Sequence, residues 1–317
     1  MAPPDPTISR DTLVRLEDPS GEAAAWIAPE HGANCVAYAV RHAGTWVQLL
    51  HSPDPAALDS FPTRFGCPIL FPFPGYVTDS VYVWRGVTRV LPANLPGTAQ
   101  FAHGFAHDRP WRIESVSPAK FEAEMNTARD LGALERSAYP FDVRLRVTVE
   151  LRDRALVMRL EATNDGRDDA PVGLGLHPYF DAAALGERST VHVRLPSGSV
   201  RTLSAGPAAS EGTELGPDVQ MPSTGRAFLG TASGLGDETV VSIAGPRADR
   251  SVRLSFLQGF RHLVIYAPAD RPSVALEPLT SAHSAASRPE GDPSGLAALR
   301  SGASLRAAVI IRLEAPE

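Results

Sequence analysis

The clearest pattern along the chain is an alternation of apolar and polar residues over positions 143–160. From residue 143 to residue 151 every second side chain is Val or Leu, and the residues between them are Arg, Thr and Glu. After residues 152–154 the alternation resumes over residues 156–160. Successive side chains of a strand point to opposite faces of a sheet, so this pattern predicts a β-hairpin with one buried and one solvated face.

Short stretches of the same kind recur along most of the chain. They lie at residues 24–27, 35–40, 46–50, 81–90, 111–116, 191–195, 240–243, 252–256, 263–266, 274–276 and 307–313. So many short strands separated by Pro, Gly and Asp predict an all-β fold, a large antiparallel β-sandwich. Helical periodicity is scarce, and only residues 55–60 and 182–185 favour one helical turn each.

Two stretches, 196–225 and 283–298, are rich in Ser, Gly, Pro and Ala and favour long surface loops. Strand patterns resume on both sides of each stretch without a change in composition, so neither is typical of an interdomain linker. We therefore expect a flexible N-terminus over residues 1–8 and a single domain over residues 9–317.

Composition and charge narrow the class of protein. With 43% hydrophobic and 21% charged residues, the 317-residue chain can bury a sizeable core. The net charge of -6 and the lack of a clustered basic patch argue against nucleic acid as a partner. No apolar run approaches the roughly 18 residues of a membrane-spanning helix, and residues 1–6 do not resemble a secretory signal. We expect a cytoplasmic protein without membrane partners.

The two cysteines, Cys35 and Cys67, lie among mostly apolar neighbours. Such a pair can form one bridge, but the sequence favours two free buried thiols.

Two histidines and a glutamate in short apolar motifs are the candidates for chemistry, because burial can tune their pKa values towards neutrality. His177 precedes Pro178, which is expected to interrupt a strand ladder there, and the alternative role for His177 is a hydrogen-bonded core residue. Glu277 ends the apolar stretch 273–276, and its alternative role is an ion pair with Arg271. His103 opens a turn that contains a glycine.

Four motifs, taken in chain order, resemble those of the aldose 1-epimerase (galactose mutarotase) family over roughly residues 12–313. They are Arg64–Gly75 (RFGCPILFPFPG), His103–Trp111 (HGFAHDRPW), Gly173–Phe180 (GLGLHPYF) and Ala275–Thr280 (ALEPLT). The resemblance implies a galactose mutarotase-like supersandwich with its site on a concave sheet face.

The resemblance also implies roles for individual residues. His177 would be the general acid that protonates the ring oxygen of a sugar, and Glu277 the general base that takes the proton of the anomeric hydroxyl. His103 would hydrogen-bond the substrate, as would Asp237, for which Glu238 is the alternative. No metal or organic cofactor is implied.

The chain departs from the family pattern at Tyr76, where many relatives carry a substrate-binding arginine. We expect Tyr76 and Tyr179 to face the ligand, because their hydroxyls need partners. Arg64, at the start of its motif, is the candidate to supply the missing cation, although its spacing does not show that it reaches the site. His107 stands where relatives often carry arginine, and we interpret it as a surface or supporting residue. Its spacing of four from His103 can bind zinc on a helix, but Gly104 disfavours a helix there.

The leading hypothesis is therefore an aldose 1-epimerase acting on a free aldohexose, as a monomer or homodimer. A hexose-6-phosphate 1-epimerase is the second hypothesis, with a phosphate site built from cations such as Arg64, Arg85, Arg89 and Arg109. The third is a non-catalytic carbohydrate-binding or sensing module of the same fold.

Overall fold

The predicted hairpin lies at the centre of the structure, a computed structural model that describes residues 12–53, 55–95, 97–204, 211–246 and 250–314. Strands β12 (Val143–Arg152) and β13 (Ala155–Asn164) pair in antiparallel, with Val147 opposite Leu160. Every apolar side chain of β12 is buried and its polar side chains are partly or fully exposed, so the period-two prediction is confirmed. The all-β prediction is confirmed as well, whereas the expected loose terminus, residues 1–8, lies outside the described residues.

Both strands belong to a nine-stranded antiparallel sheet with the order β10-β11-β12-β13-β27-β23-β22-β17-β20. Its other members are β10 (Arg112–Ser117), β11 (Lys120–Asn126), β17 (His192–Arg194), β20 (Asp218–Gln220), β22 (Val240–Ala244), β23 (Ser251–Gln258) and β27 (Ser304–Glu314).

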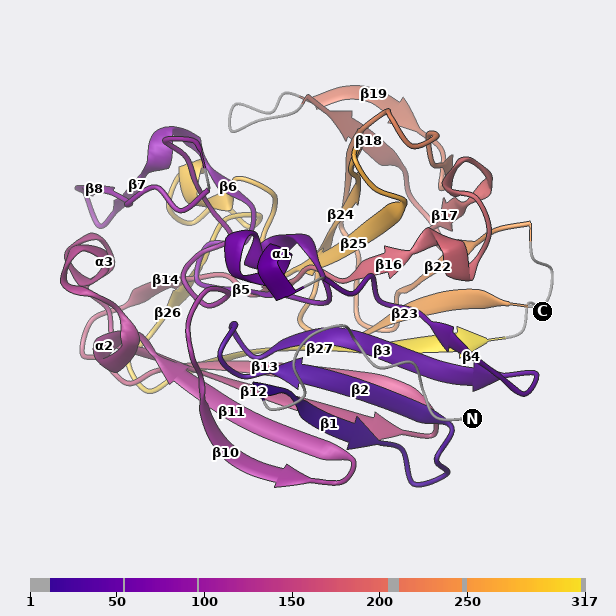
Figure 1. The fold of residues 1–317 in the computed structure, drawn as a ribbon. Helices are drawn as coiled ribbons and strands as arrows, with labels where there is room; N and C mark the ends of the chain where they lie inside the picture. Colours follow the sequence, from indigo (N-terminus) through magenta and orange to yellow (C-terminus); the bar gives the residue numbers. More distant parts are fainter. Residues whose placement is uncertain (1–11, 54, 96, 205–210, 247–249, 315–317) are drawn as a thin grey trace.

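A four-stranded sheet from the start of the chain lies beside this large sheet (Figure 1). It contains β1 (Val14–Glu17), β2 (Ala23–Ala28), β3 (Asn34–His42) and β4 (Thr45–Gln48). The hydroxyl of Tyr38 donates a hydrogen bond of 2.6 Å to the carbonyl of Arg154, in the turn between β12 and β13. Ile27, Leu145 and Met158 share one buried apolar cluster, which joins the two sheets.

A third, eight-stranded sheet carries the candidate site. Along the order β19-β18-β21-β24-β25-β15-β5, with β16 also paired to β25, its strands are β5 (Ile69–Leu70), β15 (Gly175–Leu176), β16 (Tyr179–Asp181), β18 (Val200–Leu203), β19 (Glu211–Leu215), β21 (Phe228–Ser233), β24 (His262–Ala267) and β25 (Ser273–Leu279). Every residue of β25 is buried, which makes it the core strand of this sheet. The predicted interruption at Pro178 is present between β15 and β16.

Short hairpins and helices complete the fold (Figure 1). The paired strands are β6 (Tyr76–Val77) with β9 (Phe101–Ala102), β7 (Val81–Trp84) with β8 (Val87–Val90), and β14 (Ala170–Val172) with β26 (Ala297–Leu299). The helices are α1 (Pro55–Ser60), α2 (Thr127–Asp130) and α3 (Ala133–Ala138), with 3₁₀ turns η2 (Pro62–Arg64), η3 (Thr78–Ser80), η4 (Ala182–Ala184), η5 (Arg188–Thr190) and η6 (Ala285–Ser287). The two predicted helical turns, at 55–60 and 182–185, are confirmed as α1 and η4.

Three predictions need correction. The stretch 81–90 is two strands, because Arg85 and Gly86 adopt positive φ and reverse the chain. The predicted loop 196–225 contains β18, β19 and β20, which are short and largely solvent-exposed, so they lack an apolar signal. Helices α2 and α3 are too short for a helical period and depend on local capping, such as the Asn126 side chain accepting from the N–H of Ala128.

Two further predictions concern bulk properties. Cys35 and Cys67 are free and buried, as expected, and the N–H of Cys67 donates to the carbonyl of Cys35 at 3.0 Å. None of the helices in the described ranges is long and apolar enough to cross a bilayer.

Candidate active site

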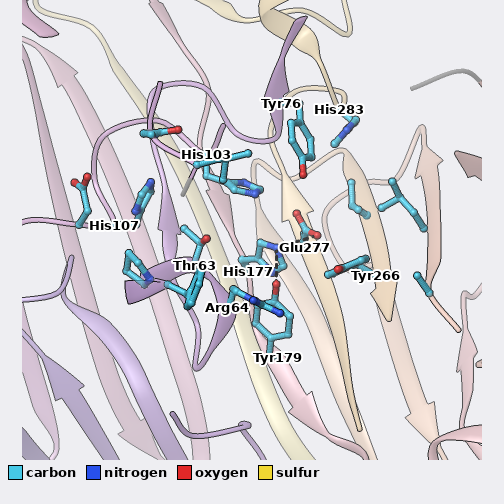
Figure 2. Close-up of a pocket in the computed structure, with 18 of the residues that line it drawn as sticks. Thr63, Arg64, Tyr76, His103, His107, His177, Tyr179, Tyr266, Glu277 and His283 are labelled. Atoms are coloured by element: carbon cyan, nitrogen blue, oxygen red, sulfur yellow. Dashed lines mark hydrogen bonds and ion pairs between the residues drawn. The ribbon is translucent and has the colours of Figure 1, made fainter. Parts of the chain in front are cut away.

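A cavity of about 600 Å³ opens over the eight-stranded sheet. The predicted site residues that line it are Arg64, Tyr76, His103, His177, Tyr179 and Glu277. They come from segments far apart in the sequence, and Figure 2 shows their side chains converging on one space. Asp237, by contrast, is not among the lining residues.

The backbone around His177 is anchored on both sides of the break between β15 and β16. The N–H of His177 donates to the carbonyl of Pro68 at 3.0 Å, and that of Tyr179 to the carbonyl of Gly66 at 2.8 Å. The imidazole stacks on the Tyr179 ring, with centroids 4.5 Å apart and an interplanar angle of 12°. The Tyr179 hydroxyl lies 3.3 Å from Nε2 of His177. Tyr179 therefore orients the imidazole through ring stacking and through its hydroxyl.

Glu277 projects from β25 towards the same imidazole. Its Oε1 lies 3.2 Å from Nε2 of His177, and each side chain is only 4% exposed. Arg271, the alternative partner for Glu277, instead lies over the rings of Phe65 and Tyr179, at 5.5 and 5.2 Å, and pairs with Asp270. Glu277 thus faces His177 in the cavity.

Burial sets the protonation of this pair. Desolvation raises the pKa of Glu277 well above its ordinary value and lowers the pKa of His177 to about 3. Both shifts favour the form of the pair in which the carboxyl of Glu277 holds a proton that it can donate to Nε2 of the neutral imidazole. Transfer of that proton from Oε1 of Glu277 to Nε2 of His177, 3.2 Å away, turns the carboxyl into a base and the imidazole into an acid.

His103 reaches the cavity through an unusual backbone turn. Both His103 and Gly104 have positive φ, 64° and 77°, and the N–H of His103 donates to the carbonyl of Gly75 at 2.8 Å. A Cβ on Gly104 would lie 1.9 Å from the carbonyl oxygen of Phe71, so only glycine fits there. The turn brings the His103 ring centroid to 5.2 Å from that of His177. A left-handed non-glycine residue at a cavity is typical of a functional constraint.

Tyr76 and Arg64 border the cavity from opposite sides of Glu277 (Figure 2). Tyr76 lies on β6, opposite Ala102 of β9, and burial raises the pKa of its hydroxyl, which keeps it neutral. The guanidinium of Arg64 is paired with Asp270 and lies 5.0 Å from the ring centroid of Phe61.

Asp237 is a predicted site residue that the structure places elsewhere. Its carboxylate accepts a hydrogen bond of 2.9 Å from the N–H of Gly259 and pairs with Arg261 at 2.7 Å. These contacts hold Asp237 at an exposed turn outside the residues that line the cavity, and the sugar contact expected from it stays a prediction.

Comparison with known proteins places this site in a family. The sequence model of the family described as aldose 1-epimerase matches residues 13–312. The chain belongs to the aldose 1-epimerase family. Two uncharacterized proteins of Escherichia coli K12 match part of it: YihR, 24% identical over 51% of this chain and 51% of its own length, and YphB, 26% identical over 43% and 44%. The matched stretches span about half the length of these curated relatives.

Solved structures related to this aldose 1-epimerase family member share its whole fold. Slr1438 from Synechocystis sp. PCC 6803 superposes with a TM-score of 0.77 at 21% identity, covering 100% of this chain and 98% of that chain. A GalM/aldose epimerase homologue from Caenorhabditis elegans has a TM-score of 0.78 at 12% identity, covering 96% and 99%. A galactose mutarotase-like protein from Clostridium acetobutylicum has a TM-score of 0.77 at 17% identity, covering 97% and 100%. The galactose mutarotase-like supersandwich is thereby confirmed.

Several residues of the cavity were not predicted from the sequence. Tyr266, Arg271 and His283 line it, and so does His107, which is buried and not on the surface. Both ring nitrogens of His107 and His283 are buried without a hydrogen-bond partner in the described part of the chain. Tyr266 lies on the largely buried strand β24, whereas His283 lies in an irregular segment whose composition carries no signal of its position.

The histidines that line the cavity do not form a zinc site. His103 and His107 lie in a turn, not on a helix, so they lack the geometry of a helical zinc pair. Across residues 12–314, apart from the gaps in the description, no group of three His, Cys, Asp or Glu side chains is placed to hold a metal ion.

Proposed function

We propose that this protein is an aldose 1-epimerase that interconverts the α and β anomers of a free aldohexose. The 3.2 Å approach of Glu277 to His177 inside a sugar-sized cavity is the observation that supports it most strongly. Family membership supports the same reaction class.

The reaction needs an acid and a base that act on two oxygens of a single carbon. In a pyranose the anomeric carbon, C1, carries both the ring oxygen O5 and the hydroxyl O1. A base at O1 and an acid at O5 must therefore lie close together on neighbouring positions. Glu277 and His177 satisfy that requirement, and general acid–base catalysis of this kind contributes about 10²–10⁴-fold.

Glu277 and His177 together hold one proton throughout the reaction. Glu277 as carboxylate takes the proton of O1, the O1 electron pair forms the C1=O1 double bond, and the C1–O5 bond breaks. O5 takes a proton from the imidazolium of His177. Rotation about C1–C2 presents the other face of the aldehyde, and the two residues reverse their roles as the ring closes.

Burial of the pair affects the energetics of this cycle. The resting form, protonated Glu277 with neutral His177, is the protonation state of the ring-open complex. One proton transfer across the existing contact produces the form that opens the ring. The polar groups of a bound sugar then replace water in stabilising the charged pair.

The site favours a neutral sugar over a phosphorylated one. Among the candidate phosphate ligands, Arg85, Arg89 and Arg109 do not line the cavity. Arg64 and Arg271 do, but both pair with Asp270, which leaves one excess positive charge between them. A phosphate dianion normally takes several cations.

Polarimetry tests the proposal. Freshly dissolved α-D-glucose and α-D-galactose should reach anomeric equilibrium faster with the wild-type protein, in proportion to its concentration. Glucose 6-phosphate serves as the parallel substrate, and a more than tenfold preference for it would move the assignment to a hexose-6-phosphate epimerase. Binding of sugar without any gain in rate would leave only a carbohydrate-binding module.

A further inference from the structure

His283 lines the cavity and has no part in the proposed proton transfers. It follows β25 by a few residues, in the segment 280–296 between β25 and β26, and its side chain lines the cavity. Several contacts hold this segment: Ala282 N–H donates to the carbonyl of Ser294 at 2.8 Å, Thr78 N–H to the hydroxyl of Ser287 at 3.3 Å, and Arg85 pairs with Glu290 at 2.8 Å. His283 is therefore held in place by the surrounding chain.

The imidazole of His283 has hydrogen-bonding capacity that the protein leaves unused. Both Nδ1 and Nε2 are buried, and neither has a partner among the residues described. Burial lowers the pKa of His283 to about 4, so at neutral pH the ring is uncharged, with one donor and one acceptor. A buried polar group without a partner costs free energy, and a ligand hydroxyl can supply both missing bonds.

Tyr76 completes a neutral hydrogen-bonding pair with His283. Their ring centroids lie 5.8 Å apart in an edge-on arrangement. Figure 2 shows the Tyr76 hydroxyl directed towards Glu277, with His283 beside it, and both lie on the side of Glu277 away from His177. Of the basic side chains among the described lining residues, Arg64 and Arg271 are both paired with Asp270.

The covalent structure of the sugar identifies the group that meets this corner. C1 is bonded to O5, O1 and C2. If O5 lies at His177 and O1 at Glu277, then C2 and its hydroxyl lie on the far side of O1, towards Tyr76 and His283. We propose that His283, together with Tyr76, binds the hydroxyl on C2 of the substrate and so selects aldoses that carry it. This inference rests on the proposed function for the placement of O1 and O5.

Under this proposal Tyr76 binds the C2 hydroxyl, a role that its position in the sequence does not reveal. Where relatives place a charged arginine, this chain uses a phenol and an imidazole, both neutral. Two neutral groups distinguish one sugar from another by the geometry of their hydrogen bonds, and they attract anions only weakly. Substitution of either ring by an apolar one should remove the selection without removing the acid and the base.

Calorimetric binding of D-glucose, 2-deoxy-D-glucose and 3-deoxy-D-glucose tests the inference without depending on catalysis. For wild type we expect loss of the C2 hydroxyl to weaken binding about threefold to tenfold, as for a neutral hydrogen bond. In His283→Phe that penalty should fall at least threefold, and in Tyr76→Phe/His283→Phe the two sugars should bind equally within twofold. The penalty for 3-deoxy-D-glucose should not change. His283→Gln, whose amide offers a donor and an acceptor, should restore part of the C2 preference.

Control variants distinguish a specific effect on the C2 hydroxyl from a general effect of the substitution. His192→Phe changes an exposed histidine that pairs with Asp218 outside the cavity, and it should match wild type for all three sugars. If His283→Phe does not fold, His283→Ala provides the same comparison. Equal weakening of D-glucose and 2-deoxy-D-glucose binding, or no binding by wild type, would overturn the inference. A wild-type protein that shows the C2 preference but no polarimetric rate gain would refute only the epimerase reaction.

Discussion

Near pH 5.5 the unfolded chain carries an ionised Glu277 and a protonated His177. Burial in the folded protein favours the reverse, a protonated Glu277 and a neutral His177. The unfolded carboxyl and imidazole titrate near 4.5 and 6.5, so between these values the unfolded pair holds one proton, on His177. The folded pair also holds one, on Glu277, and its contribution to stability is then independent of pH. Above 6.5 the unfolded pair holds none, so stability falls as pH rises. Below 4.5 the unfolded pair holds two, so stability falls as pH drops towards 3.

The change Glu277→Gln should therefore stabilise the protein increasingly with pH. Gln keeps the shape of the carboxyl but does not need to take up a proton on folding. The gain in unfolding free energy should grow from pH 4.5 upward by at most about 1.4 kcal/mol per pH unit. Urea unfolding at pH 5, 6, 7 and 8 measures it, with Glu238→Gln as the exposed control. A gain that does not vary with pH would show that Glu277 is ionised in the folded protein.

The residues of the site could be predicted only in part. His103, His177 and Glu277 lie in short motifs with distinctive neighbours, so the sequence is sufficient to identify them. His283 has no motif, and it lines the cavity from the irregular segment between β25 and β26. Asp237 fits the family order in the sequence, but local contacts with Gly259 and Arg261 fix it at an exposed turn.

At the level of elements, the turn at His103 and Gly104 is the most constrained part of the site. Its backbone passes so close to Phe71 that no side chain fits at Gly104. Strands such as β12 could be predicted because one face is buried and the other solvated. The short strands β18, β19 and β20 and the helices α2 and α3 could not, because short exposed elements have no apolar period.

We expect Gly104→Ala to lower the unfolding free energy by about 3 kcal/mol and to impair sugar binding by displacing His103. Gly44→Ala is the matched control, because Gly44 has a similar φ of 79° but nothing within 4 Å of its added Cβ. It should cost only the backbone strain, about 1 kcal/mol. Urea unfolding of both variants measures the difference. Equal losses would mean that the Phe71 contact relaxes without cost.

At the scale of the whole molecule, one apolar cluster spans all three large sheets. Tyr38 of the four-stranded sheet, Leu145 of the nine-stranded sheet and Leu276 of the eight-stranded sheet all belong to it. The site sits on strands that this shared core supports, so its geometry depends on the intact sandwich. The predicted single domain over residues 9–317 has this continuity as its physical basis.

A single core predicts that the chain unfolds in one cooperative transition. Far-ultraviolet circular dichroism reports all strands, whereas tryptophan fluorescence reports four sites: Trp26 on β2, Trp46 on β4, Trp84 on β7 and Trp111. The two signals should give coincident thermal transitions. Separate midpoints would show that the N-terminal sheet or the β7–β8 hairpin unfolds independently, and would contradict the single-domain prediction.

The most direct test of the account is the polarimetric kcat of Glu277→Gln on the sugar that the wild type turns over best, at pH 7. The account predicts a loss of at least about 10²-fold, as for removal of a general base, in a protein at least as stable as wild type. Glu238→Gln, the same change outside the cavity, should retain the wild-type kcat. A Glu277→Gln protein that keeps more than about a tenth of the wild-type kcat would contradict the assignment of the base.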